Sequence, residues 1–214
     1  MKKLYAILIV LCTMLSGCAA NGIPDMTEPE HPDVYSKFIG VPILLSAYGS
    51  YVQLDDEWAI TAAHNSILFP TSEFIPHPIC DLALVRVEGE ANTKMDAIYW
   101  SRDKELEHVG YPMSMPQARD TGKLLQIVDG KMSADKGVCS NIVTDAAIIA
   151  GMSGGGIYNS EGSLVGVTTD IVRWFSGVEG TIPEASRYSV GPYLYHYRDW
   201  VLEVTGNDYF VGSK

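Results

Sequence analysis

The stretch Gly151-Met152-Ser153-Gly154-Gly155-Gly156 sets one serine among glycines, and the interpretation of the chain starts from it. A serine hydroxyl is a poor nucleophile until the backbone presents it and a base removes its proton. Glycine lets the backbone turn sharply and approach a substrate closely. The N–H groups of Gly151 and Ser153 can then form an oxyanion hole, which binds the negative oxygen of an acyl-transfer intermediate. Because glycine-rich hexamers are more often plain loops, the remaining chain decides between the two interpretations.

The composition is that of a strand-rich globular protein with an acidic surface. The chain has 214 residues, including 20 Gly and 11 Pro, which suits one domain or two small ones with many turns. Its formal net charge is −11, and removal of residues 1–17, with two lysines and no acid, leaves 13 − 26 = −13. Such a surface repels phosphate backbones, so we expect no nucleic-acid partner.

The N-terminus has the pattern of a secretory signal. Lys2 and Lys3 precede an apolar run over residues 4–15 that is too short to span a bilayer comfortably. The following Leu-Ser-Gly-Cys of residues 15–18 resembles the lipobox of bacterial lipoproteins, in which the signal is cut before the cysteine and the sulfur of that cysteine is acylated. This resemblance predicts a signal peptide over residues 1–17 and a membrane anchor at Cys18. Ala19 after the cysteine resembles lipoproteins sorted to the outer membrane, which places the protein in the bacterial cell envelope, facing the periplasm.

Residues 18–34 contain three prolines, four acids and few apolar side chains, which predicts a flexible, solvated tether that spaces the domain from the membrane. Beyond it, two cysteines remain, Cys80 and Cys139. An oxidising compartment permits a disulfide between them. Sequence alone does not give the distance between their Cα atoms, so a disulfide and two buried thiols are both open.

Short β-prone segments dominate the rest of the chain. We expect a first unit over residues 35–116, a second over 117–192, and a C-terminal helix and tail over 193–214. The mixed charge and prolines of residues 101–118 mark the boundary between the units. The one convincing helical period, residues 192–204, ends just before Gly206.

Three residues with complementary chemistry follow one another in the chain. His64 ends WAITAAH (residues 58–64), Asp81 opens DLALVRV (81–87), and Ser153 lies in the glycine-rich stretch. A base activates a serine, and a carboxylate orients that base. Asp55, Asp56 and Asp145 remain alternatives for the orienting acid. The other four histidines have no such context, and we expect structural or surface roles for them.

The order His, Asp, Ser and all three motifs resemble the trypsin-like serine proteases. TDAAIIAGMSGGGIYNSEGSLVGVTT (residues 144–169) is similar to the corresponding run of the high-temperature-requirement (HtrA-type) proteases. The resemblance covers roughly residues 40–204. It implies an all-β fold of two antiparallel six-stranded β-barrels with a short C-terminal α-helix. It also implies a substrate pocket floored near Ala147 and walled by Thr169, Asp170 and Ile171.

The chain departs from this family at several positions. His64 and Asp81 lie only 17 positions apart, although an extended chain can still turn out and back over that length. Met152 stands where trypsins carry the aspartate that pairs with a freed N-terminus. Asn65 replaces the cysteine that follows the histidine in trypsins, so their disulfide at this position is lost.

The resemblance predicts a serine endopeptidase that cleaves proteins or peptides with His64, Asp81 and Ser153 and needs no cofactor or metal. The cysteines and histidines lack the spacing of metal ligands. Two other functions remain open: an inactive protease fold kept as a binding module of the envelope, and hydrolysis of a non-peptide ester. The oligomeric state does not follow from the sequence.

Overall fold

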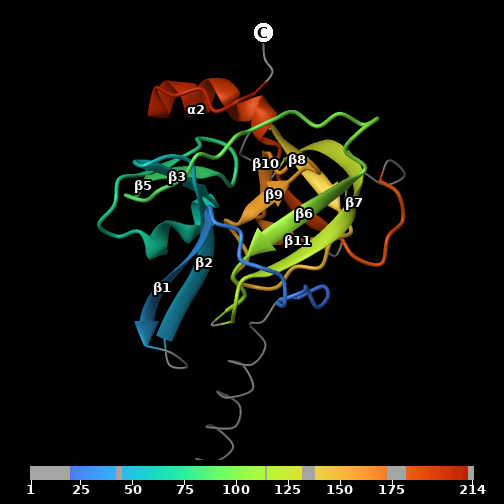
Figure 1. The fold of residues 1–214 in the computed structure, drawn as a ribbon, viewed down its shortest axis with the longest axis horizontal. Helices are drawn as coiled ribbons and strands as arrows, with labels where there is room; N and C mark the ends of the chain where they lie inside the picture. The colour runs from blue at the N-terminus through green and yellow to red at the C-terminus, as the bar shows by residue number, and fades with distance from the viewer. Residues whose placement is uncertain (1–19, 42–44, 114, 132–137, 173–181, 212–214) are drawn as a thin grey trace, which may run out of the picture.

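A computed structural model describes residues 20–41, 45–113, 115–131, 138–172 and 182–211, which form two antiparallel β-sheets side by side (Figure 1). The first sheet has five strands in the order β1-β2-β3-β5-β4: β1 (Val34–Val41), β2 (Leu45–Gln53), β3 (Trp58–Thr61), β5 (Ala83–Arg86) and β4 (Phe74–Pro76). A short 3₁₀ helix, η1 (Ala63–Leu68), follows β3.

The second sheet has seven strands in the order β10-β9-β6-β7-β8-β12-β11. Their bounds are β10 (Leu164–Val167), β9 (Gly156–Tyr158), β6 (Glu105–Gly110), β7 (Ala118–Lys131), β8 (Val138–Thr144), β12 (Ser189–Pro192) and β11 (Asp170–Ile171). The chain then forms a 3₁₀ turn, η2 (Leu194–Tyr197), and the helix α2 (Arg198–Thr205).

The ends of paired strands explain how distant motifs meet. In the first sheet Thr61 of β3 pairs with Ala83 of β5, so the residues just after β3 and just before β5 share one edge. His64 and Asp81 are those residues. In the second sheet Gly156 of β9 pairs with Val167 of β10, which brings the residues before β9 and after β10 together in the same way.

One hydrophobic cluster lies between the sheets and joins them. It contains fully buried side chains from both, among them Leu84, Val109 and Leu164, and also Leu194 of η2. Figure 1 shows α2 on the side of the first sheet, and there Trp200 packs edge-to-face on His77 at 5.0 Å between ring centroids. Gly206, with φ +76°, ends the helix in the left-handed conformation that glycine adopts readily.

The all-β class and the C-terminal helix agree with the sequence expectation, but three details differ. The described strands divide into five and seven rather than six and six. β6 belongs to the second sheet, so the boundary falls between residues 86 and 105, before the expected position near 116, because β6 finds its partners in β7 and β9. The regular helix begins at Arg198, since the preceding turn is 3₁₀.

The predicted tether is the largest difference. Residues 20–33 do not extend freely from the domain; they run along the second sheet, with many of their side chains exposed. Asp25 and Arg119 exchange two backbone hydrogen bonds of 2.8 Å, and Gln117 accepts a hydrogen bond from the His31 N–H. These bonds satisfy the backbone of a segment whose composition alone favours disorder. None of the helices in the described ranges is long and apolar enough to cross a membrane.

His108 is fully buried in the second sheet, where Thr168 and Thr144 bind its two ring nitrogens at 2.9 and 2.8 Å. Burial lowers its pKa to about 3 from the ordinary 6.5. Below pH 6.5 the unfolded chain therefore binds a proton at this position that the folded chain does not. As the pH is lowered from 6.5 toward 3, this residue is expected to lower the free energy of unfolding by about 1.4 kcal/mol per pH unit. Urea unfolding at several pH values, compared with His108→Gln, measures the contribution; equal slopes in both proteins would contradict it.

Candidate active site

His64 and Asp81 form a close pair at the edge of the first sheet. The His64 Nδ1 lies 2.7 Å from one carboxylate oxygen of Asp81, and the backbone N–H of His64 donates to the other oxygen at 2.9 Å. The hydrogen bond that His64 donates to Asp81 raises the pKa of His64 above 6.5, although burial works against it. Burial would raise the pKa of Asp81, but its hydrogen bonds, first the one from His64, hold that pKa below its usual range. Asp81 is therefore an ionised carboxylate that fixes the orientation of the imidazole.

The other acids considered from the sequence have different partners. Asp55 accepts hydrogen bonds from the N–H groups of Glu57 and Trp58. Asp145 accepts the backbone N–H of Lys123 at 2.6 Å. Asp81 is thus the acid that the fold brings to His64.

The glycine-rich loop is held open by β2. Ser50 Oγ donates to the carbonyl of Gly151 at 2.8 Å, and the Ser50 N–H donates to the carbonyl of Ser153 at 2.9 Å. Gly151 has φ +100°, and a Cβ there would lie 2.7 Å from the carbonyl oxygen of Tyr111. Within the described residues, the N–H groups of Gly151 and Ser153 donate no hydrogen bond, whereas that of Met152 donates to Ile149. In the described part of the chain, Gly151 and Ser153 itself thus keep backbone donors available, as an oxyanion hole requires.

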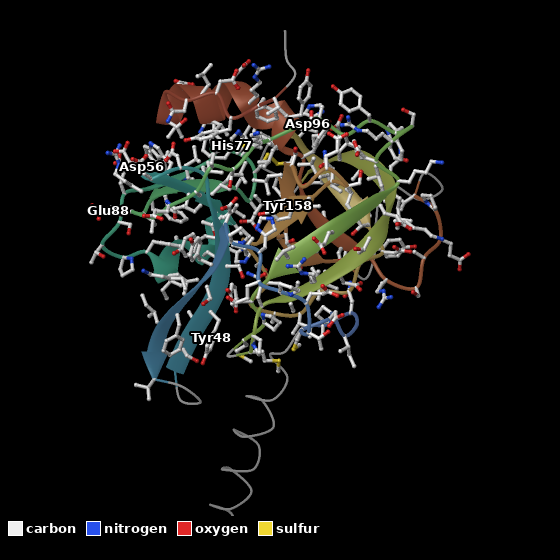
Figure 2. The ribbon with its side chains drawn as sticks, in the orientation of Figure 1. Tyr48, Asp56, His77, Glu88, Asp96 and Tyr158 are labelled. Atoms are coloured by element: carbon white, nitrogen blue, oxygen red, sulfur yellow. A yellow bond between two sulfur atoms is a disulfide. The ribbon has the colours of Figure 1, made fainter. Side chains whose placement is uncertain are left out.

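Ser153, His64 and Gly151 line one open cavity of about 220 Å³ between the two sheets. Tyr48 of β2 lines it from the first sheet and is labelled in Figure 2. The Ser153 hydroxyl donates to the carbonyl of Thr169 at 3.0 Å, and no hydrogen bond joins it to His64 in the part of the chain that is described. The fold thus brings Ser153 and His64 to one cavity, with the serine hydroxyl turned to the Thr169 carbonyl.

Asn65 is a residue whose role the sequence did not indicate. Its side-chain amide donates to the carbonyl of Ser153 at 2.9 Å and to Thr61 Oγ1 at 3.0 Å. A Cβ on the neighbouring Gly49 would lie 2.8 Å from this amide, so Gly49 leaves the room that Asn65 fills. Asn65 therefore connects the short helix that carries His64 to the backbone of the serine.

The pocket wall differs in one residue from the expectation. Thr169, Asp170 and Ile171 line the cavity, but its other wall is formed by residues 148–151. Ala147, expected at the floor, is 1% exposed and does not line the cavity. Its N–H donates to Asp120 at 2.5 Å, which turns the residue toward β7 and leaves Ile148 facing the cavity.

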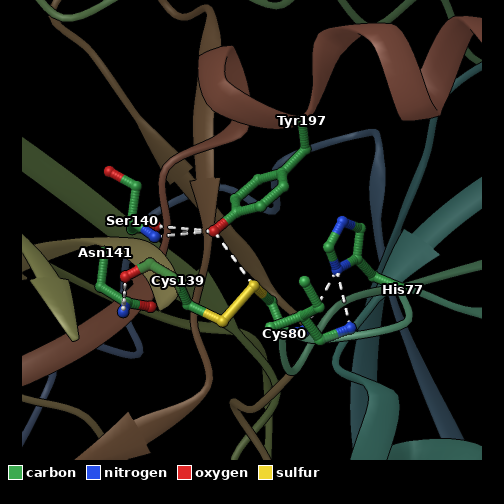
Figure 3. The surroundings of a disulfide bond; sticks show 7 residues. His77, Cys80, Cys139, Ser140, Asn141 and Tyr197 are labelled. Carbon is green, nitrogen blue, oxygen red and sulfur yellow. Dashed lines mark hydrogen bonds between the residues drawn. A yellow bond between two sulfur atoms is a disulfide. The ribbon is translucent and has the colours of Figure 1, made fainter. Parts of the chain in front are cut away.

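A disulfide joins Cys80 to Cys139 and resolves the alternative that the sequence left open (Figure 3). Their Cα atoms lie 5.6 Å apart, and the bond links the residue before Asp81 to β8 of the second sheet. Around it, Tyr197 Oη donates toward Cys80 Sγ at 3.3 Å, and His77 Nδ1 accepts the Cys80 N–H at 3.1 Å. The loop that presents Asp81 is thus attached to both sheets. Cys18 lies outside the described residues.

The fold is shared with known proteases of solved structure. The protease Rv3671c of M. tuberculosis in its active form superposes with a TM-score of 0.64 at 14% identity, over 89% of this chain and 91% of that one. The HtrA-type protease AlgW with a tripeptide gives 0.58 at 18% identity, over 82% of this chain. This chain spans only 62% of the AlgW chain. No curated protein sequence matches this chain.

A sequence family described as the trypsin-like peptidase domain matches residues 49–167, which is more than half of the chain. The matched range contains the His64–Asp81 pair and the loop of Ser153. The chain belongs to the trypsin-like peptidase family.

Proposed function

We propose that this protein is a serine endopeptidase, anchored in the bacterial cell envelope through Cys18, that cleaves protein substrates with His64, Asp81 and Ser153. The observation that carries the proposal is the 2.7 Å contact between His64 Nδ1 and Asp81, at a cavity that Ser153 also lines. A histidine oriented by a partly buried carboxylate beside an accessible serine is the arrangement that acyl transfer needs.

The reaction begins when the Ser153 side chain turns from the Thr169 carbonyl toward His64 Nε2, a rotation about one bond. Ser153 Oγ attacks the peptide carbonyl carbon, and His64 takes the hydroxyl proton. The N–H groups of Gly151 and Ser153 bind the resulting oxyanion. His64 then gives its proton to the leaving amine, which leaves an acyl-enzyme. Water, deprotonated by His64, attacks the acyl carbon; the bond to Ser153 Oγ then breaks, His64 returns the proton to that oxygen, and the second product leaves as an acid.

The test of this function is cleavage of an unfolded protein by the purified chain and its loss in Ser153→Ala. The alternative is an inactive protease fold that binds proteins. The hydrogen bond from Ser153 to the Thr169 carbonyl favours that alternative, because it holds the hydroxyl away from His64. Binding of an unfolded protein without cleavage, unchanged in Ser153→Ala, would replace the protease proposal.

The anchor would hold the active site close to the membrane. Asn21, which pairs with the pocket wall at Ile148, lies three positions after Cys18, and an extended chain covers about 10 Å over that length. Since residues 20–33 pack on the domain, they add no spacer. We propose that substrates are cleaved near the bilayer surface, with the outer membrane as the expected site.

Replacement of the anchor cysteine tests the location. Cys18→Ser should give an unprocessed or soluble protein, because several acyl chains on one residue, at about 0.8 kcal/mol per buried methylene, are needed for firm attachment. Detergent phase partitioning and metabolic labelling with palmitate measure this. Identical partitioning of both proteins, without palmitate incorporation, would refute the anchor.

The pocket wall predicts cleavage after small aliphatic residues. Ile148 and Ile171 face the cavity, and the carboxylate of Asp170 accepts the N–H of Ile171 at the exposed rim. A substrate with Ala or Val before the cut bond should be cleaved about 10- to 100-fold faster than one with a charged residue there, since the isoleucines desolvate a charge and the lining carboxylate, Asp170, is exposed at the rim, where water screens it. A peptide-library profile measures the preference. In Ile171→Gly the pocket should also accept larger residues before the cut bond. A profile dominated by Arg, Lys or Glu would contradict the prediction.

A further inference from the structure

The first described residues lie against the loop that carries the active serine. Ala20 forms an antiparallel bridge with Ile149, and Asn21 donates its backbone N–H to the carbonyl of Ile148 at 3.2 Å. Asp25 continues the contact at the end of β7 through Arg119. This short segment, residues 20–25, therefore lies along the loop that forms the pocket wall.

Asn21 makes the densest contacts in the segment. Its side-chain oxygen accepts the N–H of Ile148 at 2.8 Å, and its amide nitrogen donates to Ser189 Oγ at 2.9 Å and to the carbonyl of Tyr188 at 3.3 Å. A weaker contact of 3.5 Å reaches the carbonyl of Ala146. One side chain thus connects the pocket loop with the start of β12.

The pocket loop depends on such contacts because no strand ladder holds it. β8 ends at Thr144 and β9 begins at Gly156, and the residues between them form turns and isolated bridges. Besides Asn21, other side chains hold the start of this loop: Asp120 accepts the Ala147 N–H, Ser189 donates to the Ala146 carbonyl at 2.7 Å, and Arg187 donates to the Asp145 carbonyl at 2.8 Å. The same loop supplies Ile148 to the pocket and the N–H groups of Gly151 and Ser153 to the oxyanion hole.

Gly22 shows how closely the segment approaches. A Cβ at this position would lie 2.7 Å from Ala147 Cβ and 2.3 Å from the Arg187 guanidinium. Only a residue without a side chain brings Asn21 onto Ile148 at hydrogen-bonding distance. The contact therefore depends on the sequence of the segment itself.

We propose that Asn21 is a positioning residue that sets the pocket wall, and through it the oxyanion donors, by accepting the N–H of Ile148. The inference rests on the proposed protease function. Without the acceptor, the Ile148 N–H is left unpaired, and the backbone of residues 147–149 shifts to find another partner. Because Ile148 and Gly151 belong to the same loop, the shift changes both the fit of the substrate side chain and the rate of acylation.

The experiment uses the full-length chain in detergent and compares Asn21→Ala, Asn21→Asp and Thr27→Ala. Asp keeps the oxygen that accepts from Ile148 and loses the donors. Thr27 lies in the same region, but its side chain bonds only to Asp25, which makes it the matched control. A fluorophosphonate titrates the competent active sites, so that a loss of folded protein does not change the kcat/KM calculated per site. The readouts per titrated site are kcat/KM for two peptides with Ala or Phe before the cut bond, and the ratio of the two values.

Asn21→Ala is expected to lower kcat/KM for the Ala peptide by about 10- to 100-fold and to reduce the preference for Ala over Phe. Asn21→Asp should keep the preference within about threefold, and Thr27→Ala should match the wild type. An unchanged preference in Asn21→Ala, or an equal loss in Asn21→Asp, overturns the inference and leaves the protease function intact. A wild-type chain without titratable sites overturns the protease function, and the inference with it.

Discussion

Asp81→Asn should lower kcat about 10⁴-fold, by analogy with the same change in a well-studied triad. The carboxylate of Asp81 accepts the Nδ1 proton of His64 and leaves Nε2 free to take the proton of Ser153. An amide in its place donates to Nδ1, which favours the tautomer with the proton on Nε2. In that tautomer Nε2 cannot accept the proton of Ser153. Peptide cleavage by Asp81→Asn, normalised to folded protein, measures the effect.

The pH profile provides an independent readout of the same contact. A base must be neutral to accept a proton, and Asp81 raises the pKa of His64 above 6.5. The wild-type kcat/KM should therefore rise with pH through a midpoint above 6.5, and this limb should move to lower pH in Asp81→Asn. Asp55→Asn is the control, since Asp55 contacts the backbone of a turn away from the cavity. Similar losses in both variants would contradict the role of Asp81.

Removal of the disulfide should have the second large effect. Cys80 and Cys139 are 59 positions apart, and closing a loop of that length lowers the entropy of the unfolded chain, a stabilisation of about 4 kcal/mol. We expect the double variant Cys80→Ser/Cys139→Ser to lose most of this free energy of unfolding. Activity at moderate temperature should fall as well, because the bond anchors the residue before Asp81. Urea unfolding followed by circular dichroism measures the loss.

A reducing agent supplies the control for the disulfide. It should shift the urea midpoint of the wild type toward that of the double variant and leave the double variant unchanged. Two accessible thiols at Cys80 and Cys139 in the denatured, unreduced chain would show that the bond is absent.

The sequence predicted those parts of the site that local patterns encode. WAIT forms β3 and ALVR forms β5, and their antiparallel pairing places His64 and Asp81 at one edge. The glycines around Ser153 predicted a sharp turn of the backbone, and Gly151 and Gly154 adopt positive φ there. These features depend on residues close in the chain or on a short strand period, and a single sequence shows both.

The missed features depend on contacts between distant segments. Asn21 lies 127 positions from Ile148, and Asn65 lies 88 positions from Ser153. The proline-rich acidic segment was predicted to be a tether because its composition does not reveal the strand edge with which it forms hydrogen bonds. The sequence predicted Ala147 in the pocket, where the structure has Ile148, for the same reason. The Ala147 N–H donates to Asp120 of β7, a contact between distant segments.

The central claim is that Ser153 is a nucleophile activated by His64, and labelling with a fluorophosphonate tests it most directly. The purified chain, with residues 20–33 retained, is incubated with the reagent and digested, and the modified peptide is identified by mass spectrometry. The account predicts one phosphonylated residue, Ser153, with labelling reduced at least about 10³-fold in His64→Ala and absent in Ser153→Ala. A folded chain that stays unlabelled, or that is labelled equally fast without His64, would contradict it.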